Sequence, residues 1–457
     1  MFPVSSIASP AQIPSPRAEV RRLLGLAWPV MLTSLNWTLL HVTDVVMVGM
    51  AGTREVAALG ASRSLTFVGI VVVLGWLSGV LVFASRADGA RDLPATGRVL
   101  HEGLVAAVLL GLASGGILFA FAAPLLRLLG VAPDLVPAAA AVVRTMAFAY
   151  PFQLLSIAAG FFLEGISRPR RVAAVNLGLL PINALLAWAL VAGHLGLPAL
   201  GAVGAALATA IASAIGAVAL LLGVLGLPDA AVRHVGRWRG AAAPSWQGVR
   251  ALLGFGLVPA VASGLELVGF AVLIGLSTQL GGAAAHAFQI VFSIHNVTFA
   301  IALGLGSAAG VRAGNAVGQG LPRRAVARGV LAAGLGAGAT GLLALGLLGS
   351  AGWITGLFPA TDEVHRLAAA MLLCWAPFIL FDGVQVVLVY ALRALGDQVV
   401  AGGNSIVAFF VVTGGVGWLL VGAGVGPLAL AWASGIGMVV AALLHAARLA
   451  WLARRMG

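Results

Sequence analysis

The sequence of 457 residues contains no lysine and only one cysteine, Cys374, and only 9% of its residues are charged. Without lysine the chain lacks the phosphate-binding residue of a Walker A loop, which excludes ATP-driven pumping. A single cysteine permits no intramolecular disulfide. With so little charge, 61% hydrophobic residues and a mean hydropathy of +1.07, a water-soluble globule would be insoluble. The chain is therefore predicted to be a polytopic membrane protein.

Apolar stretches long enough to cross a bilayer recur along the whole chain. A helix needs about 20 mainly apolar residues to cross about 30 Å of hydrocarbon, and this criterion predicts twelve spans. Their approximate limits are 24–48, 56–84, 98–124, 137–165, 171–193, 199–226, 250–276, 284–310, 325–350, 366–392, 398–424 and 427–452. The expected fold is an all-α integral membrane protein with twelve transmembrane helices.

The longest polar connector, residues 227–249, divides the spans into two sets of six. We expect a cytoplasmic N-terminal tail over 1–23, an N-terminal six-helix lobe over 24–226, this connector, and a C-terminal six-helix lobe over 250–457. The two sets resemble each other at a spacing of about 230 residues, which is typical of a duplicated transporter. For example, RRLLGLAWPV begins at Arg21 and RALLGFGLVPAV begins at Arg250. Six spans per repeat give both halves the same orientation, with a cavity between the lobes.

The formal net charge of +12 comes from 26 arginines against 14 acidic residues. The arginines fall in short clusters between apolar spans, which argues against a nucleic-acid-binding protein. Of the 26, 21 lie in the tail, in the connector or in loops on the same side as these. Because cytoplasmic loops retain positive charge, both termini are predicted to be cytoplasmic. Two of the remaining five, Arg63 and Arg144, are near enough to span ends to extend outward to water.

Three acidic residues interrupt the apolar runs: Asp44 in LLHVTDVVMVG, Glu266 in VPAVASGLELVGFAVLIGL and Asp382 in CWAPFILFDGVQVVLVYAL. None has an arginine within one helical turn. A carboxylate at bilayer depth costs about 2.5–3.5 kcal/mol on insertion scales, so these residues are expected to bind or relay a cation. At 1.5 Å per residue, Glu266 lies about 21 Å and Asp382 about 15 Å from the cytoplasmic end of its span. These two carboxyls could share a cation; the alternative is a hydrogen bond that joins two helices.

Other features have simpler interpretations. Glycines at every fourth position of one span allow a neighbouring helix to approach closely: Gly306, Gly310, Gly314 and Gly318. The membrane histidines His41, His286 and His295 are expected to bond to neighbouring helices rather than to relay protons. Glu164 lies beside an arginine-rich loop and is expected to be a solvated partner of Arg168 or Arg171.

The segments around the three carboxyls resemble a known family. Pro29, fifteen residues before Asp44, the segment TDVVMVGMAG, GLELVGF around Glu266 and FDGVQVVLVYALRALGD around Asp382 are similar to the multidrug and toxic compound extrusion (MATE) family. The resemblance covers nearly the whole chain, and is greatest to the bacterial branch with a seventh-helix Glu and a tenth-helix Asp. It implies a two-lobe exporter of organic cations and other drugs in the bacterial inner membrane. Export would be exchanged for Na⁺ or H⁺ bound at Glu266 and Asp382, with no other cofactor.

The same resemblance implies a polar cluster in the N-terminal lobe. Asp44 would be supported there by Gln153 and Asn176. The fifth span carries no acid, and Leu180 stands where several family members have a second Asp. This pattern favours a protonatable Asp44 over a Na⁺ site in that lobe. Pro29 removes one backbone donor from the first helix, so we expect it to act as a hinge as Asp44 gains or loses a proton.

Two other functions were weighed against this one. A flippase or exporter of lipid-linked or polysaccharide precursors commonly has added spans and a strongly basic central cavity, whereas this chain has twelve spans and few arginines at depth. An integral-membrane transferase would need clustered Asp, Arg and His at the interface. We therefore expect a secondary active multidrug exporter and not an enzyme. It would be a monomer whose partners are small-molecule drugs and the lipid bilayer, with no nucleic acid.

The arginine asymmetry predicts that both termini and the loop around Arg237 are cytoplasmic. A cysteine introduced at Ala241, in a chain whose Cys374 is replaced by serine, should resist an impermeant thiol reagent added to intact cells and react after the cells are opened. Labelling of intact cells would show that the orientation is reversed.

Overall fold

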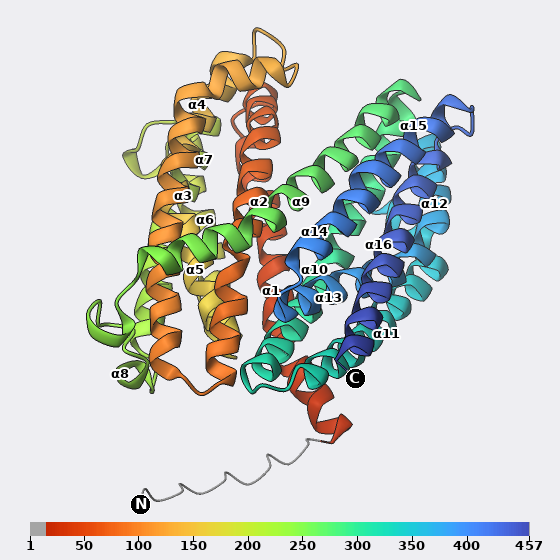
Figure 1. Cartoon of the computed structure of the whole chain (residues 1–457). Helices are drawn as coiled ribbons and strands as arrows, with labels where there is room; N and C mark the ends of the chain where they lie inside the picture. Colours follow the sequence, from red (N-terminus) through yellow and green to blue (C-terminus); the bar gives the residue numbers. More distant parts are fainter. Residues whose placement is uncertain (1–14, 457) are drawn as a thin grey trace, which may run out of the picture.

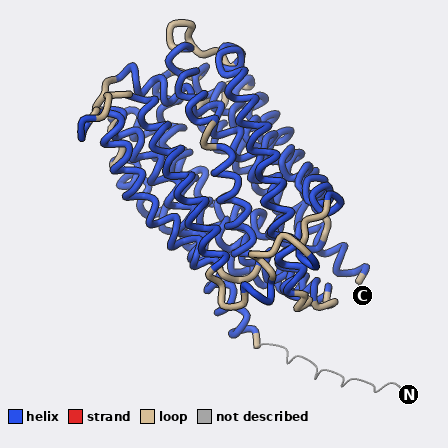
Figure 2. The backbone as a smooth tube through the Cα atoms, turned by 90° about the vertical axis from the view of Figure 1, so that its left-hand side faces the viewer, coloured by secondary structure: helices blue, strands red, loops and turns tan. Residues whose placement is uncertain are grey.

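The computed structural model describes residues 15–456, and within that range the chain forms helices and short connections without strands (Figure 2). The first half contains α1 (Pro16–Gly49), α2 (Thr53–Gly89), α3 (Leu93–Leu128), α4 (Val136–Ala147), α5 (Tyr150–Gly165), α6 (Pro169–Ala192), η1 (His194–Gly196) and α7 (Gly201–Leu225). The connector contains the short helices α8 (Ala230–Arg233) and η2 (Gly240–Ala242). The second half contains α9 (Trp246–Gln279), α10 (Gly282–Gly318), α11 (Pro322–Gly356), α12 (Asp362–Trp375), η3 (Ala376–Phe378), α13 (Ile379–Leu395), α14 (Gln398–Ser405), η4 (Ile406–Thr413), α15 (Gly414–Gly422) and α16 (Leu428–Arg455).

These helices make up the twelve predicted spans, three of which are interrupted. Helices α4 and α5 form one span bent by 47°. Helices α12 and α13 are joined by the 3₁₀ turn η3, and the π-helical segment η4 lies between α14 and α15. Pro151 and Pro377 lie at the first two of these interruptions. A proline cannot donate the backbone N–H that would continue the helical hydrogen bonds, which weakens both spans at these positions.

The first helix begins earlier than the expected span. Ser15 caps it by accepting a hydrogen bond from Ala18 N at 3.3 Å, and Pro16 occupies the first helical position, where a missing N–H has no cost. Part of the segment 1–23 that the sequence assigns to the tail is therefore helical. Residues 1–14 of that segment lie outside the described residues.

The two halves of the chain form two lobes that lean apart in a V (Figure 1). One apolar cluster joins α2 to α5 and includes Tyr150, Leu154 and Phe162. Another joins helices from α9 to α16 and includes Leu273 and Trp375. Each lobe therefore has its own core.

The first helix of each half packs partly on the other lobe. Leu23 of α1 belongs to an apolar cluster built mainly from α10, α11 and α13, while Val249 and Leu252 of α9 belong to the core of the first lobe. In Figure 1, α9 accordingly crosses from one lobe to the other. Arg312 of α10 adds a two-bond ion pair to Glu19 of α1, at 2.6 and 2.7 Å. These exchanged helices connect the two lobes.

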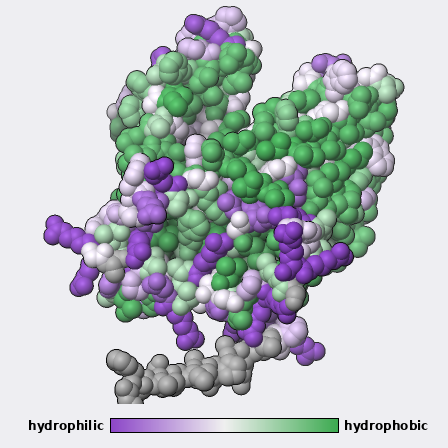
Figure 3. All heavy atoms as spheres, in the orientation of Figure 1, coloured by the Kyte–Doolittle hydropathy of each residue, from purple (hydrophilic) through white to green (hydrophobic). Residues whose placement is uncertain are grey.

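Direct contacts close the V at the end where the chain termini lie. Arg86 of α2 donates to Ala394 O at the end of α13, at 2.9 and 3.1 Å. Asn315 of α10 donates to Ser85 O of α2 at 2.8 Å. At the opposite end Figure 3 shows an open cleft between the lobes, and it shows hydrophilic side chains gathered near the termini. The protein is therefore closed on its arginine-rich side and open on the other.

The glycine face of α10 allows this closure. Side chains added at Gly314 and Gly318 would collide with Ser85 and with the backbone of Arg86, and those at Gly306 and Gly310 would meet Tyr390. The packing interpretation of these glycines is therefore confirmed. Their lack of a side chain lets α10 approach α2 and α13 closely.

The connector is folded onto the end of the first lobe. Arg233 donates to Asp88 at 2.8 Å, to Asp229 at 2.7 Å and to Thr96 at 3.0 Å. Burial acts to raise the pKa of Asp229, but the hydrogen bond and charge of Arg233 hold it below its ordinary value. Ser245 bonds to Glu102 of α3 at 2.8 Å and also caps α9. The connector thus fixes where α9 begins.

The close approach of α2 and α9 gives a stability prediction. Trp76 of α2 donates to Leu253 O at 2.8 Å, and a Cβ at Gly256 would overlap the carbonyl oxygen of Trp76. Gly256→Ala should lower the free energy of unfolding by about 1–3 kcal/mol, since overpacking forces backbone shifts. Thermal unfolding in detergent, followed by tryptophan fluorescence, measures the change.

Gly254→Ala is the matched control for this substitution. It adds the same methyl group to the same helix, at a position with nothing within 4 Å. Equal melting temperatures for the two variants would contradict the packing described here.

Candidate functional site

Asp382 lies in the first turn of α13, directly after the interruption of its span, and only 2% of it is exposed. Gln385 Nε2 donates to Asp382 Oδ1 at 3.0 Å, and His295 Nε2 of α10 lies 3.2 Å from Asp382 Oδ2. The N-terminal end of a helix favours negative charge because its free N–H groups carry partial positive charge. Within residues 15–456 no arginine forms an ion pair with Asp382. The interrupted span thus supplies a buried carboxyl held by neutral or protonatable partners.

Aromatic side chains surround the histidine of this pair. The ring centroid of His295 lies 4.9 to 5.9 Å from those of four aromatic residues: Phe270, Phe292, Phe299 and Trp375. This apolar shell keeps water from the His295–Asp382 contact, and in such surroundings a polar contact is stronger than in water. The expected bond of His295 to a neighbouring helix is confirmed, since its partner lies on α13. Its side chain in fact contacts one of the three carboxyls.

Glu266 reaches the same neighbourhood from α9. It is partly exposed, and its charge interacts with those of Asp382 and Arg393. Arg393, in the last turn of α13, lies over the ring of Tyr390, with its guanidinium carbon 5.7 Å from the ring centroid. The structure therefore places Glu266 and Asp382 near one another, as their depths suggest. It also places near Glu266 an arginine that the sequence assigns to a cytoplasmic loop.

The nitrogen partners of Asp382 limit which cation could bind there. Both carboxyl oxygens already face a nitrogen, from Gln385 and from His295. Na⁺ requires several oxygen ligands, and amide and imidazole N–H groups that point at a carboxylate compete with a metal ion for the same lone pairs. In the part of the chain that the structure describes, no three His, Cys, Asp or Glu residues are grouped to hold a metal ion.

The first lobe contains a second, separate carboxyl cluster around Asp44. Asn183 Nδ2 of α6 donates to Asp44 Oδ1 at 2.9 Å. Arg63 Nη2 of α2 lies 3.5 Å from Asp44 Oδ2 and donates to His41 O at 3.0 Å. The expectation that Arg63 extends outward to water is wrong, because its guanidinium turns inward to this carboxyl. Sequence reasoning missed it because the two residues lie on different helices.

The residues expected to support Asp44 lie elsewhere. Asn176 donates to Val172 O at 2.9 Å in its own helix, and its backbone oxygen accepts from Asn36 Nδ2 at 2.9 Å. Neither Asn176 nor Gln153 bonds to Asp44 among residues 15–456. The amide that does so, Asn183, comes three residues after Leu180. Asn183 is a polar residue in an otherwise apolar span, and this feature of the sequence could have identified it as a partner of Asp44.

Pro29 does not interrupt α1. The helix is continuous from Pro16 to Gly49, and Thr33 Oγ1 donates to Pro29 O at 3.0 Å. The hinge function of Pro29 remains a prediction about other states.

Glu164 is not the solvated partner of Arg168 or Arg171 that the sequence suggests. It is 7% exposed, and it accepts a hydrogen bond from Ser307 Oγ of α10 at 2.6 Å. The end of α5 faces the other lobe rather than the arginine-rich loop, so this carboxyl joins the two lobes at the closed end. Arg171 instead donates to Gly223 O at 2.7 Å.

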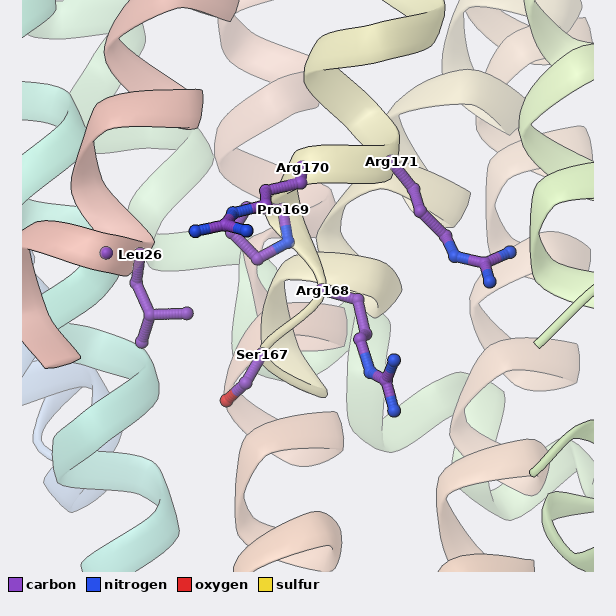
Figure 4. Close-up of a pocket in the computed structure, with 7 residues that line it drawn as sticks. Leu26, Ser167, Arg168, Pro169, Arg170 and Arg171 are labelled. Carbon is purple, nitrogen blue, oxygen red and sulfur yellow. The ribbon is translucent and has the colours of Figure 1, made fainter. Parts of the chain in front are cut away.

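Two cavities are found among the described residues, and the smaller one borders His295. One of about 460 Å³ lies between α1 and the start of α6, lined by Gly25, Leu26, Ser167, Arg168, Pro169, Arg170 and Arg171. Figure 4 shows Arg170 turned toward Leu26, while Arg168 and Arg171 point away from it. A cavity of about 10 Å³ beside His295 has room for at most one water molecule. Neither offers a closed pocket for a drug-sized ligand, so the candidate substrate space is the open cleft between the lobes.

Comparisons with known proteins agree with this architecture. The sequence profile of a family described as MatE matches residues 29–189 and 260–419, one match in each half. The multidrug resistance protein NorM of Burkholderia vietnamiensis is 32% identical over 431 residues, which are 93% of this chain and 92% of that protein. The multidrug resistance protein PmpM of Pseudomonas aeruginosa is 29% identical over 453 residues, which are 96% and 93% of the two chains.

Solved structures share the fold at lower sequence identity. The eukaryotic MATE transporter AtDTX14 has a TM-score of 0.85 at 21% identity, over 96% of this chain and 99% of that one. An outward-facing MATE family multidrug resistance transporter has a TM-score of 0.81 at 18% identity, over 96% and 97% of the two chains. Both show the same two-lobe helical arrangement along nearly their whole length.

Proposed function

The chain belongs to the MATE family of membrane transporters, and from this premise we propose that it exports organic cations and other amphipathic drugs from the bacterial cytoplasm in exchange for H⁺. Two relatives that it matches over more than nine-tenths of its length, NorM and PmpM, are described as multidrug resistance proteins. Because the members of this family are transporters, the hypothesis of an integral-membrane transferase is excluded. The protein would lie in the inner membrane.

The observation that carries this proposal is the charge balance of the second lobe. Glu266 and Asp382 provide two carboxyls, but Arg393 is the one arginine in the described residues whose charge acts on Glu266. Among the described residues, the hydrogen-bonding partners of the Asp382 carboxyl are Gln385 and His295. A carboxylate without a fixed countercharge at bilayer depth needs a cation, so one proton entering this cluster would complete the balance.

The hydrogen-bond partners of Asp382 favour H⁺ as the exchanged cation. An imidazole and a carboxyl in contact can hold one proton between them, and the two oxygens of Asp382 need not lose either nitrogen partner. A Na⁺ ion would have to displace at least one of these contacts. Glu266 would then influence the same site through its charge.

The open cleft supports transport by alternating access. The lobes are in contact at the arginine-rich end and apart at the other (Figures 1 and 3). If the termini are cytoplasmic, this is an outward-open state, in which a drug is released and a proton enters. Proton binding near Asp382 would favour closure of the cleft, since a neutral carboxyl costs less to enclose in apolar surroundings.

This proposal separates the role of Asp44 from that of Asp382. Its charge is matched by Arg63, whereas that of Asp382 is not matched by any arginine among the described residues. We therefore assign cation exchange to the second lobe and consider Asp44 separately.

Transport by purified protein in liposomes tests the proposal. A fluorescent organic cation should move against its gradient when a pH gradient is imposed without Na⁺, and a Na⁺ gradient at equal pH should drive little movement. Asp382→Asn should lower the H⁺-driven rate at least about tenfold, because it removes the carboxyl that binds the proton. Its expression and thermal unfolding should stay close to those of the native protein.

Asp362→Asn is the control, since it removes an exposed acid from the outer end of the same interrupted span. It should transport normally. Full H⁺-driven transport by Asp382→Asn would overturn the assignment, and transport driven only by Na⁺ would overturn the choice of cation.

A further inference from the structure

Asp44 is buried in the first lobe with a cationic side chain of the protein beside it. The residue is 7% exposed, and Arg63 Nη2 lies 3.5 Å from its Oδ2. The guanidinium is held at that place by its hydrogen bond to His41 O at 3.0 Å. The second oxygen of Asp44 accepts from Asn183 at 2.9 Å. Three helices, α1, α2 and α6, thus meet at this carboxyl.

The charges of this cluster cancel without any bound cation. Asp44 contributes one negative charge and Arg63 one positive charge, while Asn183 is neutral at every pH. The other titratable group that faces the pair is His41, whose ring interacts with the charge of Arg63. The cluster of the second lobe differs in this respect, because there Asp382 has no arginine partner among the described residues.

We propose that Arg63 is the resident counter-ion of Asp44, so that the first-lobe carboxyl exchanges no cation and the coupled ion binds only in the second lobe. This inference rests on the proposed function and narrows it, because it reduces the coupling site to Glu266 and Asp382. It gives Asp44 a positioning role: the ion pair joins α1 to α2, and Asn183 joins both to α6.

The side chain of Asp44 is 10% exposed and that of Arg63 is 26% exposed, so the pair is partly buried, and an unpaired charge is costly where little water reaches it. Removal of one member of a buried ion pair leaves the other uncompensated, whereas removal of both members is often nearly neutral. A proton that bound to Asp44 would leave the positive charge of Arg63 without a compensating negative charge. The charge of Asp44 is therefore tied to that of Arg63 for as long as the two side chains stay together. A carboxyl that binds the coupled cation must instead release that cation and bind it again in each transport cycle.

A double-mutant cycle in the full-length protein tests the inference. Asp44→Asn, Arg63→Gln and the double variant are compared with the native protein by thermal unfolding in detergent. Each single variant should melt about 5–10 °C below the native protein, and the double variant should recover to within about 2 °C of it. Melting shifts of the single variants that simply add in the double variant would show that the two residues are not paired, and would overturn the inference.

H⁺-driven export of a fluorescent organic cation by the same variants in liposomes gives the second measurement. Asp44→Asn should transport at least about tenfold more slowly than the native protein, and the double variant should return to within about threefold of it. A double variant as inactive as Asp44→Asn would show that the carboxyl itself carries the cation, and would overturn the inference. Arg63→Lys should be less impaired than Arg63→Gln because it keeps the charge.

Two controls separate the possible causes of failure. Arg54→Gln removes an exposed arginine near the start of the same helix and should affect neither measurement. His41→Gln tests whether the nearby imidazole accounts for any effect, and it should leave the melting cycle unchanged. If the native protein shows no gradient-driven export, the proposed function fails, while the melting cycle still decides whether Arg63 and Asp44 form the pair.

Discussion

The structure depends on one constraint: a charge placed among membrane-spanning helices needs a partner, because surroundings poor in water cannot solvate it. The protein meets this need in different ways at three carboxyls. Asp44 has a guanidinium, Glu164 has a hydroxyl from the opposite lobe, and Asp382 has an imidazole and an amide. The partners differ in whether they carry a permanent charge. The proposed function rests on that difference between Asp44 and Asp382.

Close backbone packing lets the two lobes meet at one end only. Glycines on α10 and α9 bring these helices against α2, and Arg86 then reaches the carbonyl oxygen of Ala394 near the end of α13. Because packed helices fit well in a few discrete arrangements, such an interface can exist as formed or as separated rather than deform continuously. Glu164 and Ser307 lie within it. The closed end is thus built from contacts that a change of state would have to break together.

Sequence reasoning predicted partners poorly, although it identified the carboxyls themselves. Arg63 was expected to reach water and Glu164 to bond to nearby arginines, and both expectations are wrong. The cause is the same in each case: the actual partner lies on another helix, at a sequence distance of 19 residues for Arg63 and 143 for Glu164. A pattern read along one helix gives the depth of a residue but not the direction of its side chain relative to other helices.

The membrane class, the twelve spans, the two halves and the residues at which charge enters the apolar interior could all be predicted from the amino-acid sequence. These follow from hydropathy and length, which are local quantities, because every backbone group in a bilayer must bond within its own helix. The tertiary structure alone decided that α1 and α9 cross between lobes, that His295 faces Asp382, and that Arg63 and Asn183 enclose Asp44. These depend on how each helix is rotated about its axis and on which neighbour it meets. In a chain so uniformly apolar, close packing between helices rather than hydropathy sets that rotation.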